Sequence, residues 1–269
     1  MKYLILGEET MVGRYLRQVL GKEGSGVVPG SDHEQAVVFV CGGIEESGLE
    51  ALAGAEQIVY VSSHEVYSPE AGEGVDESRP AFAWSEDGKR HARAELMLEK
   101  WCAAKGMMLT IVRPALMFGS GVDGWLLRLF NRVIRGHYVH MRGNDAKVSL
   151  VTALDTARAM AKLVGKPGIY NVSDGRAHRW IDVVEAMTAN AGAQKRMTHL
   201  PEKWAKLIYK CFGRLPIVEE CLSPEALEPF SRTCVLDNRK IIDATGMEFF
   251  DTVEVIARRE KGYPYECRM

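Results

Sequence analysis

Short apolar runs alternate along the chain with segments in which apolar residues recur every three or four positions. The short runs predict buried β-strands, and the longer periodic segments predict amphipathic helices. Regular alternation of the two predicts an α/β fold built on a doubly wound parallel sheet with right-handed crossovers. The predicted strands are residues 3–6, 27–28, 37–40, 58–62, 109–112, 148–151 and 168–172, and the predicted helices are 11–21, 45–55, 85–105, 125–135, 155–164 and 181–191.

Two of the helical segments carry more detailed predictions. Ser85 is placed to cap the helix over 85–105, whose buried stripe is expected to include Leu96, Leu98, Trp101 and Cys102. In the last part of the chain, Trp204, Leu207, Ile208 and Cys211 recur at helical spacing. This second stripe predicts a buried core and not a docking face.

The pattern weakens from Met197 onward, where prolines become frequent, at positions 201, 216, 224 and 229. This change predicts a small helical lobe after the sheet. We therefore divide the chain into a sheet domain over residues 1–165, shortened after its first helix, and residues 166–269, which hold the last sheet strand and the lobe.

Composition excludes several classes of protein. In 269 residues, 46% are hydrophobic and 26% charged, as in ordinary globular proteins. The net charge of −2 gives no bulk attraction to nucleic acid or to an anionic membrane, so neither is an expected partner. No apolar run approaches the ~18 residues of a spanning helix. The six cysteines form no Cys-x-x-Cys pair and have no histidines at zinc spacing, which favours reduced structural thiols, no metal site and a cytoplasmic location.

Small and polar residues follow two of the predicted strands. The segment Val61-Ser62-Ser63 is followed by Val66-Tyr67, and the strand over 109–112 ends in Arg113-Pro114. Open α/β sheets bind their ligands at the carboxyl ends of the strands. The sequence therefore predicts a ligand site at this edge of the sheet.

The order and spacing of these pieces resemble the extended short-chain dehydrogenase/reductase superfamily, in its NAD-dependent epimerase/dehydratase group. The resemblance covers most of residues 1–190, and five pieces carry it. They are Gly7-x-x-Thr10-x-x-Gly13, Val61-Ser62-Ser63 with Val66-Tyr67, Arg113-Pro114 through Phe118-Gly119, Val151 through Asp155-Thr156-Ala157, and Gly168-Ile169-Tyr170-Asn171-Val172.

The resemblance implies a Rossmann-like nucleotide-binding domain over 1–165, a substrate-binding lobe, and NAD or NADP as cofactor. In this family the glycine turn lets backbone N–H groups at a helix N-terminus approach the pyrophosphate. In this family the residues that follow the later strands form the floor of the nicotinamide and substrate sites. The cofactor-binding positions implied for this chain are Gly7, Thr10, Met11, Val12, Gly13, Cys41, Gly42, Ser62, Pro114, Ala115 and Leu116.

The adenine end of that site departs from the family pattern. Thr10 replaces the middle glycine of the turn, where its β-carbon would crowd the phosphate although its hydroxyl could donate to it. The chain is also too short between Gly13 and Cys41 for the usual strand–helix–strand. Asp32, about 20 residues past the turn, either binds the adenosine ribose or is a solvated loop carboxylate. We expect an incomplete adenine pocket.

The catalytic end departs further. The family uses a serine or threonine after the strand, here Ser63, which could equally satisfy backbone groups at the strand end. It also uses a Tyr-x-x-x-Lys pair, which this chain lacks. Asp87 falls at the tyrosine position and His91 at the lysine position. On one helix face they could transfer protons as a couple, or Asp87 could simply stabilise the helix dipole with His91 on the surface.

Other positions bear on the same site. Leu116 stands where sugar-nucleotide enzymes often have asparagine, which makes the site more apolar. His64 and His178 lie on candidate cleft loops, and both are expected to be surface histidines.

Two functions remain open from the sequence. The chain is either an NAD(P)-dependent epimerase/dehydratase-like protein that acts on or binds a sugar nucleotide or similar hydroxyl compound, or a non-catalytic dinucleotide-binding or regulatory protein that kept the fold. Relatives dimerise through two long helices per subunit, and the first of these is cut here to about ten residues over 45–55. We therefore expect a monomer or a weak homodimer.

Overall fold

The computed structural model describes residues 2–22, 26–27, 35–68, 71–83, 85–120, 124–192 and 197–258. Its centre is a six-stranded sheet in which every neighbouring pair is parallel. This confirms the predicted α/β class and its parallel sheet. The strands, in spatial order, are β11 (Gly168–Val172), β6 (Met108–Pro114), β4 (Gln57–Val61), β3 (Ala36–Val40), β1 (Lys2–Leu6) and β2 (Gly26–Val27).

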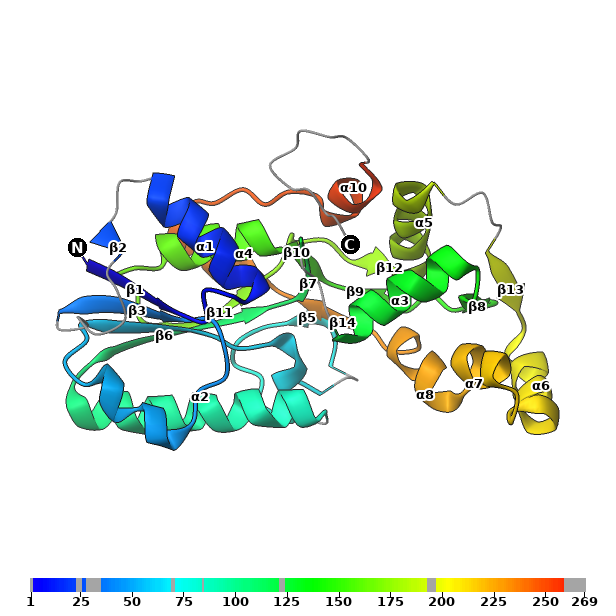
Figure 1. Cartoon of the computed structure of the whole chain (residues 1–269), viewed down its shortest axis with the longest axis horizontal. Coiled ribbons are helices and arrows are strands. Elements are labelled where there is room, and N and C mark those ends of the chain that lie inside the picture. The colour runs from blue at the N-terminus through cyan, green and yellow to red at the C-terminus, as the bar shows by residue number, and fades with distance from the viewer. Residues whose placement is uncertain are drawn as a thin grey trace.

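Helices cover both faces of the sheet, as Figure 1 shows. On one face lie α1 (Met11–Lys22), α4 (Ala153–Lys162) and α9 (Arg239–Thr245), and on the other lies α2 (Glu86–Lys105). Successive side chains of a strand point to opposite faces. Val37 and Phe39 accordingly pack in the core that contains α1 and α4, and Val38 and Val40 pack in the core that contains α2.

Helix α2 begins and ends where its sequence predicts. The Ser85 hydroxyl accepts a hydrogen bond from the Gly88 N–H at 2.9 Å, and Gly106 closes the helix in the left-handed region at φ 67°. The predicted stripe is right for Leu98 and Cys102, which are buried, and wrong for Leu96, which is exposed. Trp101 is partly buried, and Gly88, Ala94 and Glu95 supply the rest of the buried face. Glu95 points inward because it forms a buried ion pair with Arg113.

The predicted helix over 45–55 was wrong. The segment forms two short 3₁₀ turns, η1 (Glu46–Gly48) and η2 (Glu50–Leu52), which end before Gly54 at φ 92°. Glycine weakens a helix by about 1 kcal/mol, and a segment this short cannot offset that loss with intrahelical hydrogen bonds. Among the described residues, α2 is therefore the one long helix on this face of the sheet.

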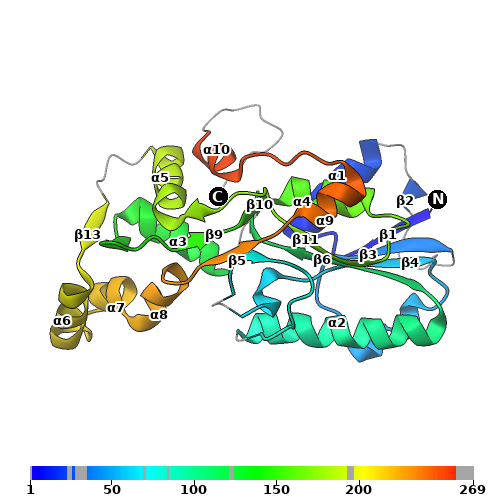
Figure 2. The same cartoon turned by 180° about the vertical axis from the view of Figure 1, so that it is seen from behind.

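The remaining elements form the lobe and the strands that connect it to the sheet (Figure 2). Its core contains Leu126, Phe130, Trp180, Val183 and Phe230. The bounds of the elements are β5 (Gly72–Val75), β7 (Leu116–Phe118), α3 (Gly124–Arg135), β8 (Val139–Met141), β9 (Lys147–Val148), β10 (Leu150–Thr152), β12 (His178–Arg179), α5 (Trp180–Ala191), β13 (Thr198–Leu200), α6 (Glu202–Phe212), α7 (Pro216–Leu222), α8 (Pro224–Leu227), η4 (Glu228–Phe230), β14 (Cys234–Leu236) and α10 (Thr252–Ala257), with η3 (His64–Val66) following β4.

The second helical stripe is also not the buried core that its spacing predicts. Trp204 is 58% exposed, Leu207 is 48% exposed, and Cys211 is exposed as well. The one buried residue of α6 is Ala205, which packs with Cys221 and Leu222 of α7. Ile208, the fourth residue of the predicted stripe, is partly buried and packs against these residues, whereas Trp204, Leu207 and Cys211 stay exposed.

Candidate functional site

The glycine turn between β1 and α1 requires glycine at both of its ends. Gly7 has φ +83°, and a β-carbon there would lie 3.0 Å from the Gly42 backbone nitrogen. A β-carbon on Gly13 would lie 2.1 Å from the Gly7 carbonyl oxygen. The start of α1 therefore packs closely against the turn at Gly7. This packing brings the first N–H groups of α1 to the edge of the sheet.

The Thr10 side chain forms hydrogen bonds with both ends of this turn. Its hydroxyl donates to the Gly7 carbonyl oxygen at 2.7 Å and accepts from the Gly13 N–H at 3.1 Å. The Thr10 hydroxyl, which could have donated to a phosphate, therefore donates to the Gly7 carbonyl oxygen instead. Thr10 thus stabilises the turn through these two hydrogen bonds.

The predicted cofactor positions gather around one cleft of about 670 Å³ at the carboxyl ends of β1, β3, β4 and β6. Gly7 and Gly13 shape the turn beside it, and Asp32 lies outside the described residues. The other predicted residues all line the cleft. They are Thr10, Met11, Val12, Cys41, Gly42, Ser62, Ser63, Asp87, His91, Pro114, Ala115 and Leu116.

Charged residues that the sequence did not single out also line this cleft. Glu9 lies in the glycine turn, where a carboxylate opposes the binding of an anion, and Arg14 and Arg128 lie nearby. Arg14 donates to the carbonyl oxygens of Glu9 at 2.8 Å and Ser120 at 3.1 Å. Burial and the nearby Glu9 charge raise the pKa of the Cys41 thiol to about 12, so this thiol is protonated at neutral pH.

Two serines follow β4 and differ in their hydrogen bonding. The Ser62 side chain is buried, lines the cleft, and its Oγ has no hydrogen-bond partner among the described residues. Ser63 Oγ accepts from the Glu65 N–H at 3.1 Å and so caps η3. Ser63 thus has the structural role that the sequence left open, while its own hydrogen is not used in that bond.

Helix α2 carries Asp87 and His91 to the opposite side of the cleft. Its first turn is pressed against η3, since a β-carbon on Gly88 would lie 2.2 Å from the Glu65 carbonyl oxygen. Lower on the helix, Glu95 and Arg113 form a buried bidentate pair with distances of 2.9 and 2.6 Å. These two contacts set the position of α2 relative to β6.

Asp87 and His91 have separate partners. The Asp87 side chain is 67% exposed and forms an ion pair with Arg90 at 3.0 Å. His91 Nδ1 lies 2.8 Å from the hydroxyl of Tyr60, which is buried in β4. The structure therefore shows no hydrogen bond between the two residues that the sequence suggested as a proton-transferring couple.

The Tyr60 contact determines the tautomer of His91. Burial raises the pKa of Tyr60, so the phenol keeps its proton, and His91 Nδ1 is its one hydrogen-bond partner among the described residues. Burial, with the Arg90 charge, lowers the pKa of His91, which keeps the imidazole neutral near pH 7. With Nδ1 accepting from Tyr60, Nε2 carries the hydrogen and is the donor available to a ligand.

A second, smaller pocket of about 250 Å³ adjoins the cleft. His64, Glu65, Asp87 and Leu116 line both, so His64 is not the plain surface histidine that the sequence predicts. Burial lowers the pKa of His64. Most of the remaining lining is apolar, from Tyr67, Val148, Trp180, Pro229 and Cys234, and Arg232 there forms a 2.7 Å ion pair with Glu228.

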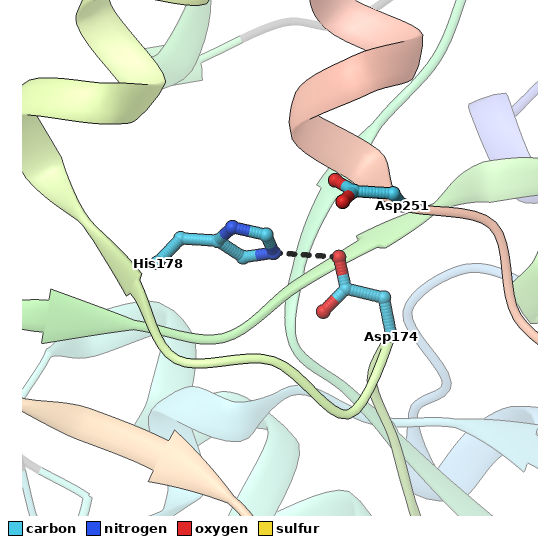
Figure 3. Close-up of side chains that lie close together, drawn as sticks. All are labelled: Asp174, His178 and Asp251. Atoms are coloured by element: carbon cyan, nitrogen blue, oxygen red, sulfur yellow. Dashed lines mark hydrogen bonds and ion pairs between the residues drawn. The ribbon is translucent and has the colours of Figure 1, made fainter.

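His178 is likewise not a surface residue. It is buried, and its Nε2 lies 2.8 Å from Asp174 Oδ2, with Asp251 close by (Figure 3). These three side chains are the one group in the described part of the chain with the composition and spacing to hold a metal ion.

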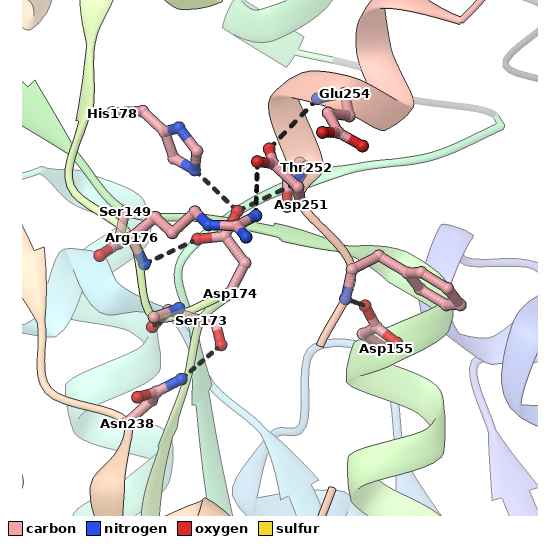
Figure 4. A network of polar contacts seen from close by, with 12 residues as sticks. Ser149, Asp155, Ser173, Asp174, Arg176, His178, Asn238, Asp251, Thr252 and Glu254 are labelled. Atoms are coloured by element: carbon pink, nitrogen blue, oxygen red, sulfur yellow. Dashed lines mark hydrogen bonds and ion pairs between the residues drawn. The ribbon is translucent and has the colours of Figure 1, made fainter. Parts of the chain in front are cut away.

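Protein groups already satisfy the oxygens of this cluster (Figure 4). Asp174 accepts from the backbone N–H groups of Arg176 at 3.2 Å and Thr252 at 3.1 Å, and the Arg176 guanidinium pairs with Asp251 at 2.5 Å. A guanidinium therefore supplies the positive charge that a metal would. The cluster holds the segment before α10 against the end of β11, and it lies apart from the cleft.

We expect stability to fall in mild acid because of buried histidines. Burial lowers the pKa of His91 and His140, whereas an unfolded histidine titrates near 6.5. Below about pH 6.5 the unfolded chain therefore binds protons that the folded chain does not, and each histidine lowers the free energy of unfolding by up to about 1.4 kcal/mol per pH unit. Urea unfolding at pH 7.5, 6.5 and 5.5 measures this slope. His91→Gln and His140→Gln should each flatten it, and a wild-type slope in both variants would contradict the assignment.

Part of this chain is similar in sequence to known proteins. Residues 45–173 match the model of the NAD dependent epimerase/dehydratase family. A curated relative, the uncharacterized protein y4nG of Sinorhizobium fredii (strain NBRC 101917 / NGR234), is 26% identical over 166 residues, which are 60% of this chain and 42% of that protein. The chain thus matches less than half the length of this relative.

Solved structures show the same fold over nearly the whole chain. The UDP-glucose 4-epimerase of Thermotoga maritima, solved with UDP-glucose, is similar at TM-score 0.70 and 16% identity, over 96% of each chain. RMD from Pseudomonas aeruginosa, complexed with NADPH, gives 0.70 and 15%, over 96% of this chain and 98% of that one. The UDP-N-acetylglucosamine 4-epimerase from Bacillus cereus gives 0.70 and 14%, over 96% and 94%.

Proposed function

We propose that this chain, of which residues 45–173 match the model of the NAD dependent epimerase/dehydratase family, binds NAD or NADP across the cleft and a hydroxyl compound in the adjoining pocket. A sugar nucleotide or a similar hydroxyl compound is the proposed substrate class. The observation that carries the proposal is Ser62, a residue that lines the cleft and whose buried Oγ has no hydrogen-bond partner among the described residues. A buried hydroxyl without a partner costs free energy that a bound ligand can recover.

The glycine turn fits the same ligand. Gly7 and Gly13 leave no room for β-carbons and bring the start of α1 to the cleft, where the helix dipole favours a pyrophosphate. Glu9 opposes this attraction, and the Thr10 hydroxyl is used within the turn. We therefore expect a dissociation constant above about 10 μM, or less than about 7 kcal/mol of binding free energy.

At the other end of the cleft, three residues have proposed roles. When bound, the nicotinamide would supply hydride exchange with a substrate carbon. Ser63 can donate its free hydrogen to a substrate oxygen, and His91 can donate from Nε2 to a ribose or substrate hydroxyl. Tyr60 acts through His91, because it holds the tautomer that makes this donor, and is a positioning residue.

A fluorescence titration with NADH and NADPH tests binding. We expect His91→Leu to weaken binding about tenfold, because the loss of one hydrogen bond to a polar ligand group amounts to about 1.4 kcal/mol. His140→Leu is the matched control, since His140 is a buried histidine that does not line the cleft. Absence of any nicotinamide binding by the wild-type chain, or equal effects of the two substitutions, would contradict the proposal.

The second candidate function is binding without catalysis. The observation that favours it is the Asp87–Arg90 ion pair, because an exposed carboxylate held by a guanidinium is a poor proton donor at the position where the family has tyrosine. Absorbance at 340 nm, with NAD⁺ or NADP⁺ and UDP-glucose, distinguishes the two. Reduction of the nucleotide, or conversion of UDP-glucose to another sugar nucleotide, that is lost in Ser63→Ala supports hydride transfer, whereas nucleotide binding with neither supports the second function.

We also propose that the chain is a monomer or a weak homodimer. The long helix that relatives place before the Ser-containing strand is replaced here by the 3₁₀ turns η1 and η2. With that helix missing, an interface of the standard ~1,600 Å² is hard to build around α2 alone.

A further inference from the structure

A group of exposed apolar side chains lies on α6 and on its connection to α7. We define the α6 surface as these side chains together with the basic residues beside them. Helix α6 lies at the end of the molecule farthest from β1 in both Figure 1 and Figure 2. The apolar members are Trp204 (58% exposed), Leu207 (48%), Phe212 (56%), Leu215 (51%) and Ile217 (45%).

The helix presents its apolar and basic residues in two parallel rows. Trp204, Leu207 and Cys211 are spaced three and four residues apart, so they form one row along the helix. Lys203, Lys206 and Lys210 have the same spacing and precede each of them by one residue. A shift of one residue is a rotation of about 100°, so the lysine row runs beside the apolar row.

The α6 surface carries positive charge although the whole chain does not. Residues 202–215 contain four basic side chains and one acidic one, in a chain of net charge −2. The acidic one, Glu202, pairs with Lys206 at 2.6 Å. Glu219 of α7 lies beside these residues and accepts a hydrogen bond from the Tyr209 hydroxyl at 3.0 Å. Lys203, Lys210 and Arg214 form no ion pair within the described residues.

These features match a helix that lies in the surface of a lipid bilayer. Such helices bury tryptophan, phenylalanine and leucine at the boundary between headgroups and acyl chains, and their lysines reach anionic headgroups. An antiparallel twofold contact between two α6 helices is disfavoured, because it would bring their lysine rows together on one side. No helix in the described part of the chain is long and apolar enough to span a bilayer, so contact at the surface is the mode that remains.

We propose that the α6 surface docks the protein on anionic membrane surfaces. The net charge of −2 predicts no attraction of the whole chain to an anionic membrane. In salt, however, electrostatic attraction acts only within about 10 Å, so the local charge of the α6 surface matters more than the net charge of the chain. Docking would hold the lobe at the membrane with the nucleotide cleft away from it.

Co-sedimentation with lipid vesicles tests this. We expect the full chain to bind vesicles of phosphatidylcholine and phosphatidylglycerol at 3:1, to bind pure phosphatidylcholine at least tenfold more weakly, and to dissociate as salt is raised. The double variant Lys203→Gln/Lys210→Gln should lose about 25-fold, since each of the two charges near the surface contributes about fivefold.

The apolar row has its own variant and control. Trp204→Ser/Leu207→Ser should lose about tenfold or more, whereas Phe82→Ser, which removes a 72% exposed phenylalanine elsewhere, should bind as wild type. Equal binding to both vesicle types, no binding to either, or equal loss in the Phe82 variant would overturn the proposal. So would light scattering that shows a dimer which the α6 variants convert to monomer, because the surface would then join two copies of this chain.

Discussion

Gly13→Ala is expected to abolish measurable nucleotide binding, with a loss of about 100-fold or more. The added methyl group would lie 2.1 Å from the Gly7 carbonyl oxygen and 3.0 Å from the Glu8 Cα, both of them backbone atoms that cannot turn aside. The turn must therefore open and carry the start of α1 away from the cleft. Overpacking of this kind should also lower the free energy of unfolding by about 1–3 kcal/mol. NADH titration and urea unfolding measure the two effects.

Gly21→Ala in the same helix is the matched control. A β-carbon at Gly21 would meet no atom within 4 Å, and alanine is favoured over glycine in a helix by up to about 1 kcal/mol. This variant should bind nucleotide like the wild type and be at least as stable. If Gly13→Ala also retained binding, the glycine turn would not be part of the site.

Glu95→Ala is expected to be the most destabilising single change, at about 3–5 kcal/mol. The substitution would leave the Arg113 guanidinium buried without the two hydrogen bonds that it now makes with Glu95, and an uncompensated buried charge carries a penalty of this size. At about 2–4 °C per kcal/mol for a chain of this size, the melting temperature should fall by roughly 10 °C. Differential scanning calorimetry measures this shift.

Glu99→Ala is the control, because Glu99 is an exposed glutamate on the same helix and should shift the melting temperature by no more than about 1 °C. The double variant Glu95→Leu/Arg113→Met should recover much of the loss, since apolar side chains of similar volume can replace a buried ion pair. A small effect of Glu95→Ala alone would mean that water reaches this pair and that α2 is held mainly by its apolar contacts.

The positions of the strands of the central sheet and of helices α1 to α5 could be predicted because their causes are local. An apolar run of four or five residues is long enough to form a buried strand, and Ser85 and Gly106 supply the caps of α2 within its own segment. The parallel sheet then places the carboxyl ends of its strands together, which is why the residues of the cleft could be named before their geometry was seen.

Partners from distant segments could not be predicted in the same way. Tyr60 and His91 are 31 residues apart, and nothing in the spacing of Asp87 and His91 shows that each contacts a different group. The hydroxyl of Thr10 could equally have faced a phosphate, and its direction depends on the backbone of Gly7 and Gly13.

The sequence by itself determined the parallel sheet, the glycine turn and the absence of a Tyr-x-x-x-Lys pair, since these depend on local pattern and on identity alone. Tertiary structure decided which faces are buried. Periodicity shows that a helix has an apolar face, but the neighbouring elements decide whether that face is covered, as it is for Leu98 on α2 and is not for Trp204 on α6. Tertiary structure also decided which polar groups are satisfied, because hydrogen-bond partners such as Glu95 and Arg113 meet only when α2 packs on β6.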